Sequence, residues 1–329
     1  MLQPEAAFGY DSGVIRRQFL QTVAAGGMGL SIPTLCRGQQ PTTHTYKTAA
    51  GCEIQADVYG ASPGASKPAV MWIHGGALIV GSRKGLGGQF HTGLLQLGYV
   101  VVSIDYRLAP ETKLPAIIED VQDGYRWMRA QAGPFGIDRE RIATGGGSAG
   151  GYLTQMTGFC LEPRPRALVS YYGYGDIIGP WYSEPDEFYR HEPLVSKEDA
   201  YAAVGSKALS EPPRGSQRGK FYLYCRQNGL WPKEVAGHDP HTDAKWFDRY
   251  CPIRNVTAKY PPTILIHGTN DTDVPYSLSQ DMDAKLTQVG VEHEFITVPG
   301  AGHGLSGAKP EEIAQAADRA VQFVKAHMK

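Results

Sequence analysis

The stretch IATGGGSAG, residues 142–150, decides the fold. It places the pattern G-x-S-x-G between an expected strand at 142–144 and an expected helix at 149–160. A sharp turn between such elements pushes the Ser148 hydroxyl out of the sheet, and the glycines two before and two after it remove side chains that would clash. The helix that begins next directs its N–H dipoles at an oxyanion forming beside the serine. The stretch therefore predicts a nucleophilic serine at the end of a strand.

Two other patterns compete with this interpretation. GASPG at 60–64 also matches G-x-S-x-G, but Pro63 has no N–H to donate to an oxyanion, so a surface turn is expected there. Residues 145–150 also match the dinucleotide fingerprint G-x-G-x-x-G. That site needs an acid near the end of the next strand, and residues 170–172, Ser-Tyr-Tyr, supply none. We therefore favour the nucleophile and expect no cofactor.

Apolar runs alternate with amphipathic segments along most of the chain. This alternation predicts βαβ units and a mostly parallel sheet covered by helices on both faces, with an antiparallel pair at its N-terminal edge. Catalytic groups in such a sheet lie on loops at the carboxyl ends of the strands. Strands are expected at 44–48, 52–59, 69–73, 100–104, 142–144, 167–172, 263–267 and 292–298, and helices at 89–97, 116–132, 149–160, 278–289 and 310–325.

The motif HGGA at 74–77 follows the expected strand 69–73. Backbone N–H groups at such a position can point at a substrate oxygen. Gly75 and Gly76, together with the N–H of Ala149, would give an oxyanion hole with three donors.

Two later loops supply an acid and a base. HGTNDTDVP at 267–275 offers two carboxylates, Asp271 and Asp273. We favour Asp271 as the acid that orients a histidine, because it comes four residues after the end of a strand. Asp273 is expected to be a turn or surface acid. GAGHG at 300–304 follows the next strand, and its glycines let the backbone bring His303 back to the serine as general base and acid.

With DYRLAPE at 105–111, these motifs resemble the hormone-sensitive-lipase-like carboxylesterases, bacterial family IV, of the α/β-hydrolase fold. The order Ser, Asp, His along the chain agrees with that fold. The resemblance implies a metal-independent serine carboxylesterase. A serine peptidase or amidase of the prolyl-oligopeptidase type shares fold and triad order and stays open, as does a non-catalytic ligand-binding member. The resemblance implies a triad of Ser148, Asp271 and His303, and oxyanion donors at Gly75, Gly76 and Ala149.

Three departures from the family pattern stand out. Ala77 replaces the third glycine of H-G-G-G, and Gly147 stands before the nucleophile, where the family often has an acid. The N-terminal cap helices of the family have little room after residue 38. A lid must therefore come from 173–262, a segment too long for a simple loop. Arg107 and Glu111 are expected to lock the loop beside the oxyanion turn.

The expected lid is aromatic and polar, with few Leu or Ile. This composition favours short-chain or aromatic acyl esters over long ones, on an alcohol that could be sugar-like and stack on Trp or Tyr. The aromatic residues could equally form the lid's own core. His238, His241 and Asp243 look like metal ligands in type, but a solvated loop is favoured and no metal is expected. The aromatic residues of this segment include Trp181, Tyr182, Tyr189, Tyr222, Tyr224, Trp231 and Trp246.

Composition narrows the choice of partners. Lys plus Arg (32) nearly cancels Asp plus Glu (33), so no basic excess favours nucleic acid, and a small-molecule ester is the expected partner. The oligomeric state is not encoded in these motifs. The five cysteines contain no C-x-x-C pair; Cys225 with Cys251 is the first disulfide to examine if the protein is exported, against free buried thiols.

The N-terminal residues read as a targeting segment. RRQFLQ at 16–21 resembles a twin-arginine export signal, and the following apolar run at 22–33 is interrupted by glycines, so it predicts no stable membrane span. An amphipathic N-terminal helix, and with it a cytoplasmic location, is the alternative. We thus expect a signal segment at 1–38, a catalytic domain at 39–172 and 263–329, and an inserted lid at 173–262.

Overall fold

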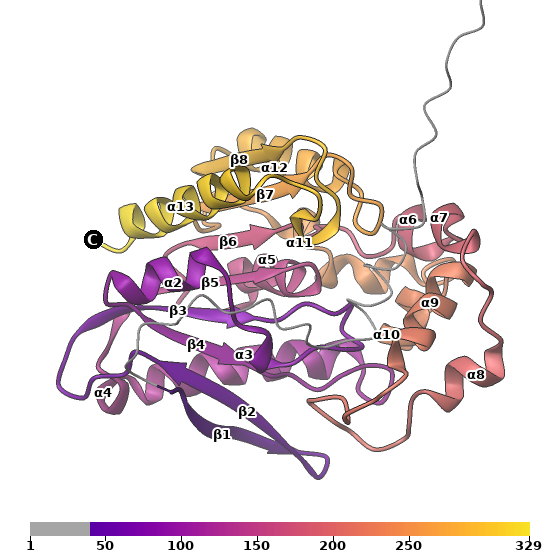
Figure 1. The fold of residues 1–329 in the computed structure, drawn as a ribbon, viewed down its shortest axis with the longest axis horizontal. Helices are drawn as coiled ribbons and strands as arrows, with labels where there is room; N and C mark the ends of the chain where they lie inside the picture. Colours follow the sequence, from indigo (N-terminus) through magenta and orange to yellow (C-terminus); the bar gives the residue numbers. More distant parts are fainter. Residues whose placement is uncertain (1–39) are drawn as a thin grey trace, which may run out of the picture.

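The structure is a computed structural model, and it describes residues 40–329. An eight-stranded sheet forms the centre of the molecule (Figure 1). The strand order is β1-β2-β4-β3-β5-β6-β7-β8. β1, β2 and β4 pair antiparallel at one edge, and every pair from β4 to β8 is parallel. The strands are β1 Thr42–Ala49, β2 Cys52–Tyr59, β3 Lys67–Ile73, β4 Val100–Ile104, β5 Ile137–Gly147, β6 Leu168–Tyr171, β7 Thr263–Gly268 and β8 His293–Val298.

Helices cover both faces of this sheet because its strands are apolar on both sides. Met71 and Ile73 of β3 pack in one apolar cluster with α3 (Leu114–Ala130) and α5 (Ala149–Cys160), whereas Val70 packs in another with α2 (Gln89–Gln96) and α13 (Pro310–His327). α12 (Ser277–Val289) packs on β7 in a third cluster. Short helices occur at α4 (Ala132–Phe135), η1 (Arg83–Gly85) and η3 (His303–Leu305).

The expected mostly parallel sheet with helices on both faces is confirmed. Some boundaries differ from those expected: β5 begins at Ile137 rather than at 142, and α3 spans Leu114–Ala130 rather than 116–132. The early part of β5 is polar and exposed, which hid it from an apolar pattern. Parallel pairing brings the carboxyl ends of β3, β5, β7 and β8 to one edge.

The segment between β6 and β7 forms short helices near one end of the sheet (Figure 1). Its aromatic residues do not form a separate core: Tyr182, Phe221 and Trp231 belong to the same apolar cluster as β3 and α5. We call residues 173–262 the insertion. Its helices are α6 Pro180–Ser183, α7 Glu187–Arg190, α8 Lys197–Ala202, α9 Arg218–Asn228, α10 Trp231–Ala236, η2 Ala244–Tyr250 and α11 Pro252–Asn255.

The cysteines of the described residues are all free thiols. Cys225 and Cys251 are both buried and do not pair with each other, so the disulfide considered above is not formed. Burial raises the pKa of the Cys251 thiol to about 12. Both therefore act as small apolar groups in the core.

The expected export signal lies outside the described residues. Within residues 40–329, none of the helices combines the length and apolar character needed to cross a bilayer.

Candidate active site

Ser148 occupies the turn between β5 and α5. Its backbone has φ 57° and ψ −123°, in the strained left-handed region. A Cβ at Gly146 would lie 2.6 Å from the carbonyl oxygen of Ile73, and one at Gly150 would lie 2.7 Å from that of His74. The glycines therefore let the turn press against β3, and the Ser148 side chain stays partly exposed.

His303 and Asp271 reach this serine from two neighbouring loops. His303 Nε2 lies 3.1 Å from Ser148 Oγ, and His303 Nδ1 lies 2.8 Å from Asp271 Oδ2. Asp271 Oδ1 accepts the backbone N–H groups of Asp273 and Val274, each at 2.9 Å. Because Asp271 is an acceptor, the proton of the neutral imidazole sits on Nδ1, and Nε2 is free to accept the serine hydroxyl.

Burial and hydrogen bonding oppose each other in this triad. Burial acts to raise the pKa of Asp271, but hydrogen bonds from His267 and His303 outweigh it and hold the pKa well below the usual range. Burial acts to lower the pKa of His303, but the nearby Asp273 and Asp271 outweigh it and raise the pKa above its ordinary value. The carboxylate is thus ionised when the imidazole takes up a proton.

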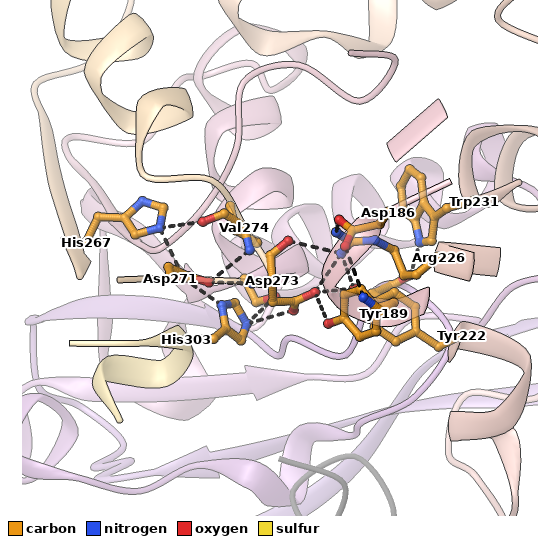
Figure 2. A network of polar contacts seen from close by, with 12 residues as sticks. Asp186, Tyr189, Tyr222, Arg226, Trp231, His267, Asp271, Asp273, Val274 and His303 are labelled. Carbon is orange, nitrogen blue, oxygen red and sulfur yellow. Dashed lines mark hydrogen bonds and ion pairs between the residues drawn. The ribbon is translucent and has the colours of Figure 1, made fainter. Parts of the chain in front are cut away.

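A second histidine holds the acid in place (Figure 2). His267 is fully buried, with Nε2 3.1 Å from both Asp271 Oδ2 and the carbonyl oxygen of Val274. Both partners are acceptors, so Nε2 carries the proton and Nδ1 accepts from Ser279 Oγ at 2.7 Å. From the sequence, His267 was expected only to end a strand. Its spacing of four residues from Asp271 was the available signal.

The oxyanion turn lies directly against the nucleophile. A Cβ at Gly75 would lie 2.7 Å from the carbonyl oxygen of Gly147 and 3.3 Å from Ser148 Cβ. Among the described residues, no backbone carbonyl accepts from the N–H of Gly75 or Gly76. Ala149 is the first residue of α5, where an N–H has no partner inside the helix. Gly75 and Ala149 therefore lie next to Ser148, and Gly76 follows Gly75 in the same turn.

The turn is held by side chains on both sides. His74 stacks on Tyr106 with ring centroids 4.2 Å apart, and its Nδ1 lies 2.7 Å from the carbonyl oxygen of Gly75. Trp231 of the insertion donates from Nε1 to the carbonyl oxygen of Ala77 at 2.9 Å. Gly76 has φ 108°, and Ala77 itself has φ 53°. The insertion thus takes part in shaping the turn where the family pattern has a third glycine.

The absence of a side chain at Gly147, where the family often has an acid, has a steric explanation in this chain. A Cβ at Gly147 would lie 3.0 Å from the Tyr172 ring and from its hydroxyl oxygen. The Tyr172 ring stands edge-on to His303 with centroids 5.0 Å apart. An aromatic ring therefore fills the space that an acidic side chain would need.

Asp273 is not the turn or surface acid that was expected. It is only 6% exposed, and its Oδ2 lies 3.3 Å from His303 Nε2. Its Oδ1 accepts from Arg226 at 2.7 Å and from the hydroxyls of Tyr189 and Tyr222 (Figure 2). The prediction failed because the three donors come from the insertion, far away along the chain.

Arg107 and Glu111 each lock a loop, but through different partners. Arg107 pairs with Asp120 of α3 at 2.7 Å. Glu111 pairs with Arg218 of α9 at 2.6 Å, and Arg218 also donates to the carbonyl oxygens of Ile79 and Ala109. The second pair fixes the insertion beside the oxyanion turn.

The metal-like residues of the insertion do not converge. His238 pairs with Asp243 at 2.9 Å, whereas His241 lies 3.0 Å from the carbonyl oxygen of Ser183. Within residues 40–329, no group of three or more His, Cys, Asp or Glu side chains is arranged to hold a metal ion.

Two family models match separate parts of the chain. One, described as BD-FAE, matches residues 56–165, which hold the oxyanion turn and Ser148. The other, the prolyl oligopeptidase family, matches residues 222–329, which hold Asp271 and His303. The two matches together contain every residue of the triad.

Two curated relatives match most of this chain. Esterase LipC of Mycobacterium tuberculosis is 29% identical over 76% of this chain and 56% of its own length. The non-reducing polyketide synthase ausA of Emericella nidulans is 28% identical over 82% of this chain and 13% of its own length. The chain thus spans about half of the esterase and a small part of the synthase.

Solved structures share the fold at low identity. A Staphylococcus aureus protein of unknown function has a TM-score of 0.71 at 22% identity and covers 88% of this chain and 100% of its own. The propionate-bound esterase Est2 of Thermogutta terrifontis has a TM-score of 0.60 at 20% identity and covers 89% and 96%.

The fold and the site together define an α/β-hydrolase with a nucleophile elbow, as the motifs led us to expect. The expected resemblance to carboxylesterases of that fold is confirmed by these relatives.

Proposed function

We propose that this chain is a serine carboxylesterase that works through an acyl-enzyme intermediate. The observation that carries the proposal is the unbroken chain of contacts from Ser148 Oγ through His303 to Asp271, beside backbone N–H groups free to bind an oxyanion. The esterase relatives support the same activity.

The geometry gives each group a role. Ser148 Oγ attacks the ester carbonyl carbon while its proton moves to His303 Nε2, and Asp271 stabilises the imidazolium that forms. The N–H groups of Gly75, Gly76 and Ala149 bind the tetrahedral oxyanion. His303 then gives the proton to the leaving alcohol. A water deprotonated by His303 attacks the acyl carbon, and the acid is released with Ser148 restored.

The substrate class that we propose rests on the composition of the insertion and on the packing of its rings. Tyr182 stacks between Trp181 and Trp231, at 3.7 and 4.1 Å between ring centroids, so these three rings pack against one another. An insertion that is aromatic and polar, with few Leu or Ile, favours short or aromatic acyl groups over long chains. The partly buried Trp181 and Trp246 leave aromatic surface on which a sugar-like alcohol would stack.

The hormone-sensitive-lipase-like subgroup, a bacterial source and export by a twin-arginine signal are also part of the proposal. They rest on the motifs at 74–77, 105–111 and 16–21. Replacing Arg16 and Arg17 by Lys should keep the protein in the cytoplasm of an expressing bacterium, whereas the unaltered chain appears in the periplasm.

A serine peptidase is the second candidate, favoured by the match of the prolyl oligopeptidase family to residues 222–329. The triad order is the same in both classes. Hydrolysis of p-nitroanilide peptides faster than of p-nitrophenyl esters would select this function.

The deciding experiment measures hydrolysis of p-nitrophenyl esters from acetyl to palmitoyl by the purified protein and by Ser148→Ala. Short esters should turn over fastest, and Ser148→Ala should lose the activity. Activity that survives in Ser148→Ala would overturn the proposal, and a preference for palmitoyl would overturn the substrate class.

A further inference from the structure

The catalytic histidine has a carboxylate on each side. Asp271 Oδ2 lies 2.8 Å from Nδ1 of His303, and Asp273 Oδ2 lies 3.3 Å from Nε2. The usual triad has only the first of these. Nε2 is the atom that exchanges a proton with the serine, so Asp273 stands beside the reacting proton itself.

Asp273 is held rigidly in this position. Its Oδ1 accepts from Arg226, Tyr189 and Tyr222, while Arg226 also donates to the backbone carbonyl of Asp273. These donors all bind Oδ1, which leaves Oδ2 directed at His303 (Figure 2).

Arg226 is itself a buried anchor. Its side chain is 1% exposed, and its second nitrogen pairs with Asp186 of the insertion at 2.6 Å. A buried guanidinium with two carboxylate partners has little freedom to move. The insertion therefore fixes the charge that faces the catalytic histidine.

We propose that Asp273 is a positioning residue that stabilises the protonated form of His303 through Nε2. The inference rests on the proposed function. In the resting state Nε2 carries a lone pair, which accepts the Ser148 hydroxyl and makes no hydrogen bond to Asp273. When Ser148 Oγ bonds to the substrate carbon, its proton moves to Nε2, and the negative charge of Asp273, with Oδ2 3.3 Å from Nε2, stabilises the imidazolium that forms. The same proton then leaves with the alcohol.

This arrangement predicts that the pH dependence of the rate is set by Asp273 and by Arg226 of the insertion. Asp273 and Asp271 raise the pKa of His303, while the charge of Arg226 opposes them. Removing the Asp273 charge therefore lowers that pKa and moves the acid limb of the rate profile to lower pH. The groups that surround the imidazole and its two carboxylates are Asp271 and Asp273 after β7, Arg226 and Tyr222 on α9, Tyr189 on α7, Tyr172 after β6, and His267 on β7.

The test compares pH profiles of kcat/KM on p-nitrophenyl acetate for the full chain and three variants, read at the isosbestic wavelength of the product. Asp273→Asn removes the charge, and Asp273→Glu keeps it. Asp243→Asn is the matched control. It makes the same change at a different Asp–His contact, the one between Asp243 and His238 in the insertion.

Asp273→Asn should move the acid limb down by about one pH unit or more, since an opposite charge at this distance shifts a pKa by about 1–3. Its plateau kcat/KM should fall by up to about tenfold for each unit of that shift. Asp273→Glu keeps the charge, so its acid limb should lie closer to that of the unaltered protein than the limb of Asp273→Asn does. Asp243→Asn should leave the limb in place. A lowered plateau with an unmoved limb would overturn the inference and assign Asp273 a packing role.

Loss of the buried charge could also unfold the single variant, which a thermal melt would reveal. The paired variant Asp273→Leu with Arg226→Met removes both charges together, and such replacements keep many buried pairs folded. It should move the acid limb in the same direction but by less, because the opposing charge of Arg226 is removed as well. An unshifted limb in the paired variant also overturns the inference, whereas activity surviving in Ser148→Ala would overturn the proposed function instead.

Discussion

Gly76 is a position where one added methyl group should strongly impair catalysis. It has φ 108°, and a Cβ there would lie 2.6 Å from the carbonyl carbon of Val80, with the carbonyl oxygen closer still. The N–H groups of Ile79 and Val80 both donate to the Gly76 carbonyl oxygen at 2.9 Å, so the turn is already tightly closed. Gly76→Ala must open it.

The magnitude follows from that contact. Ordinary contacts begin at 3.4 Å, so the Val80 carbonyl group must recede by at least 0.8 Å or the Gly76 peptide must turn. Losing one oxyanion donor lowers kcat by roughly 10²–10³-fold. An L-residue in the left-handed region costs about 1–2 kcal/mol, which lowers Tm by roughly 2–8 °C in a domain of this size.

The assay is kcat on p-nitrophenyl acetate together with a thermal melt of each variant. Gly87→Ala is the control: Gly87 is exposed, and a Cβ there would meet nothing within 4 Å. It should match the unaltered protein in both measurements. A Gly76→Ala variant that keeps kcat within about threefold would refute the assignment of this turn as the oxyanion hole.

Three further expectations concern the triad, its pH range and the insertion. Asp271→Asn should lower kcat roughly 10⁴-fold in the ester assay while the protein stays folded by circular dichroism, because the imidazole loses the acceptor that fixes its tautomer; a loss under tenfold would exclude Asp271 as the triad acid. The rate should fall with decreasing pH through a His303 pKa above its ordinary 6.5, since only the neutral imidazole accepts the serine proton, and an acid limb well below pH 6 would contradict this. Trp231→Phe leaves the Ala77 carbonyl oxygen without its donor. The free energy of unfolding in urea should fall by about 1–3 kcal/mol, and kcat should fall as well. An unchanged urea midpoint and an unchanged rate would mean that this hydrogen bond is dispensable.

Local chemistry was enough to predict the centre of the site. The turn at Ser148 needs a strand, a helix and small neighbours, and all three requirements are written within residues 142–160. His303 and Asp271 were found because parallel strands bring their carboxyl ends to one edge, so the loops that follow them must meet. The pairing of β5 with β3 and of β7 with β8 meets that condition.

The environment of Asp273 could not be predicted in this way. Arg226 lies 47 residues before Asp273, on a helix whose polar and apolar residues show no clear amphipathic pattern. Several helices of the insertion, such as α6 and α7, have only four residues, too few for a periodic signal. Burial of a carboxylate by distant donors is a tertiary event, and sequence proximity to Asp271 gave no sign of it.

The insertion is fastened to the catalytic machinery at three points: Trp231 to the oxyanion turn, Arg218 to the loop beside it, and Arg226 to Asp273. Such a segment is a poor candidate for exchange between homologous enzymes. A chimera carrying a foreign segment between β6 and β7 would inherit Asp273 as a lone charge and Ala77 with an unpaired carbonyl. Any redesign of the insertion in this protein should therefore keep these three anchors and vary the residues between them.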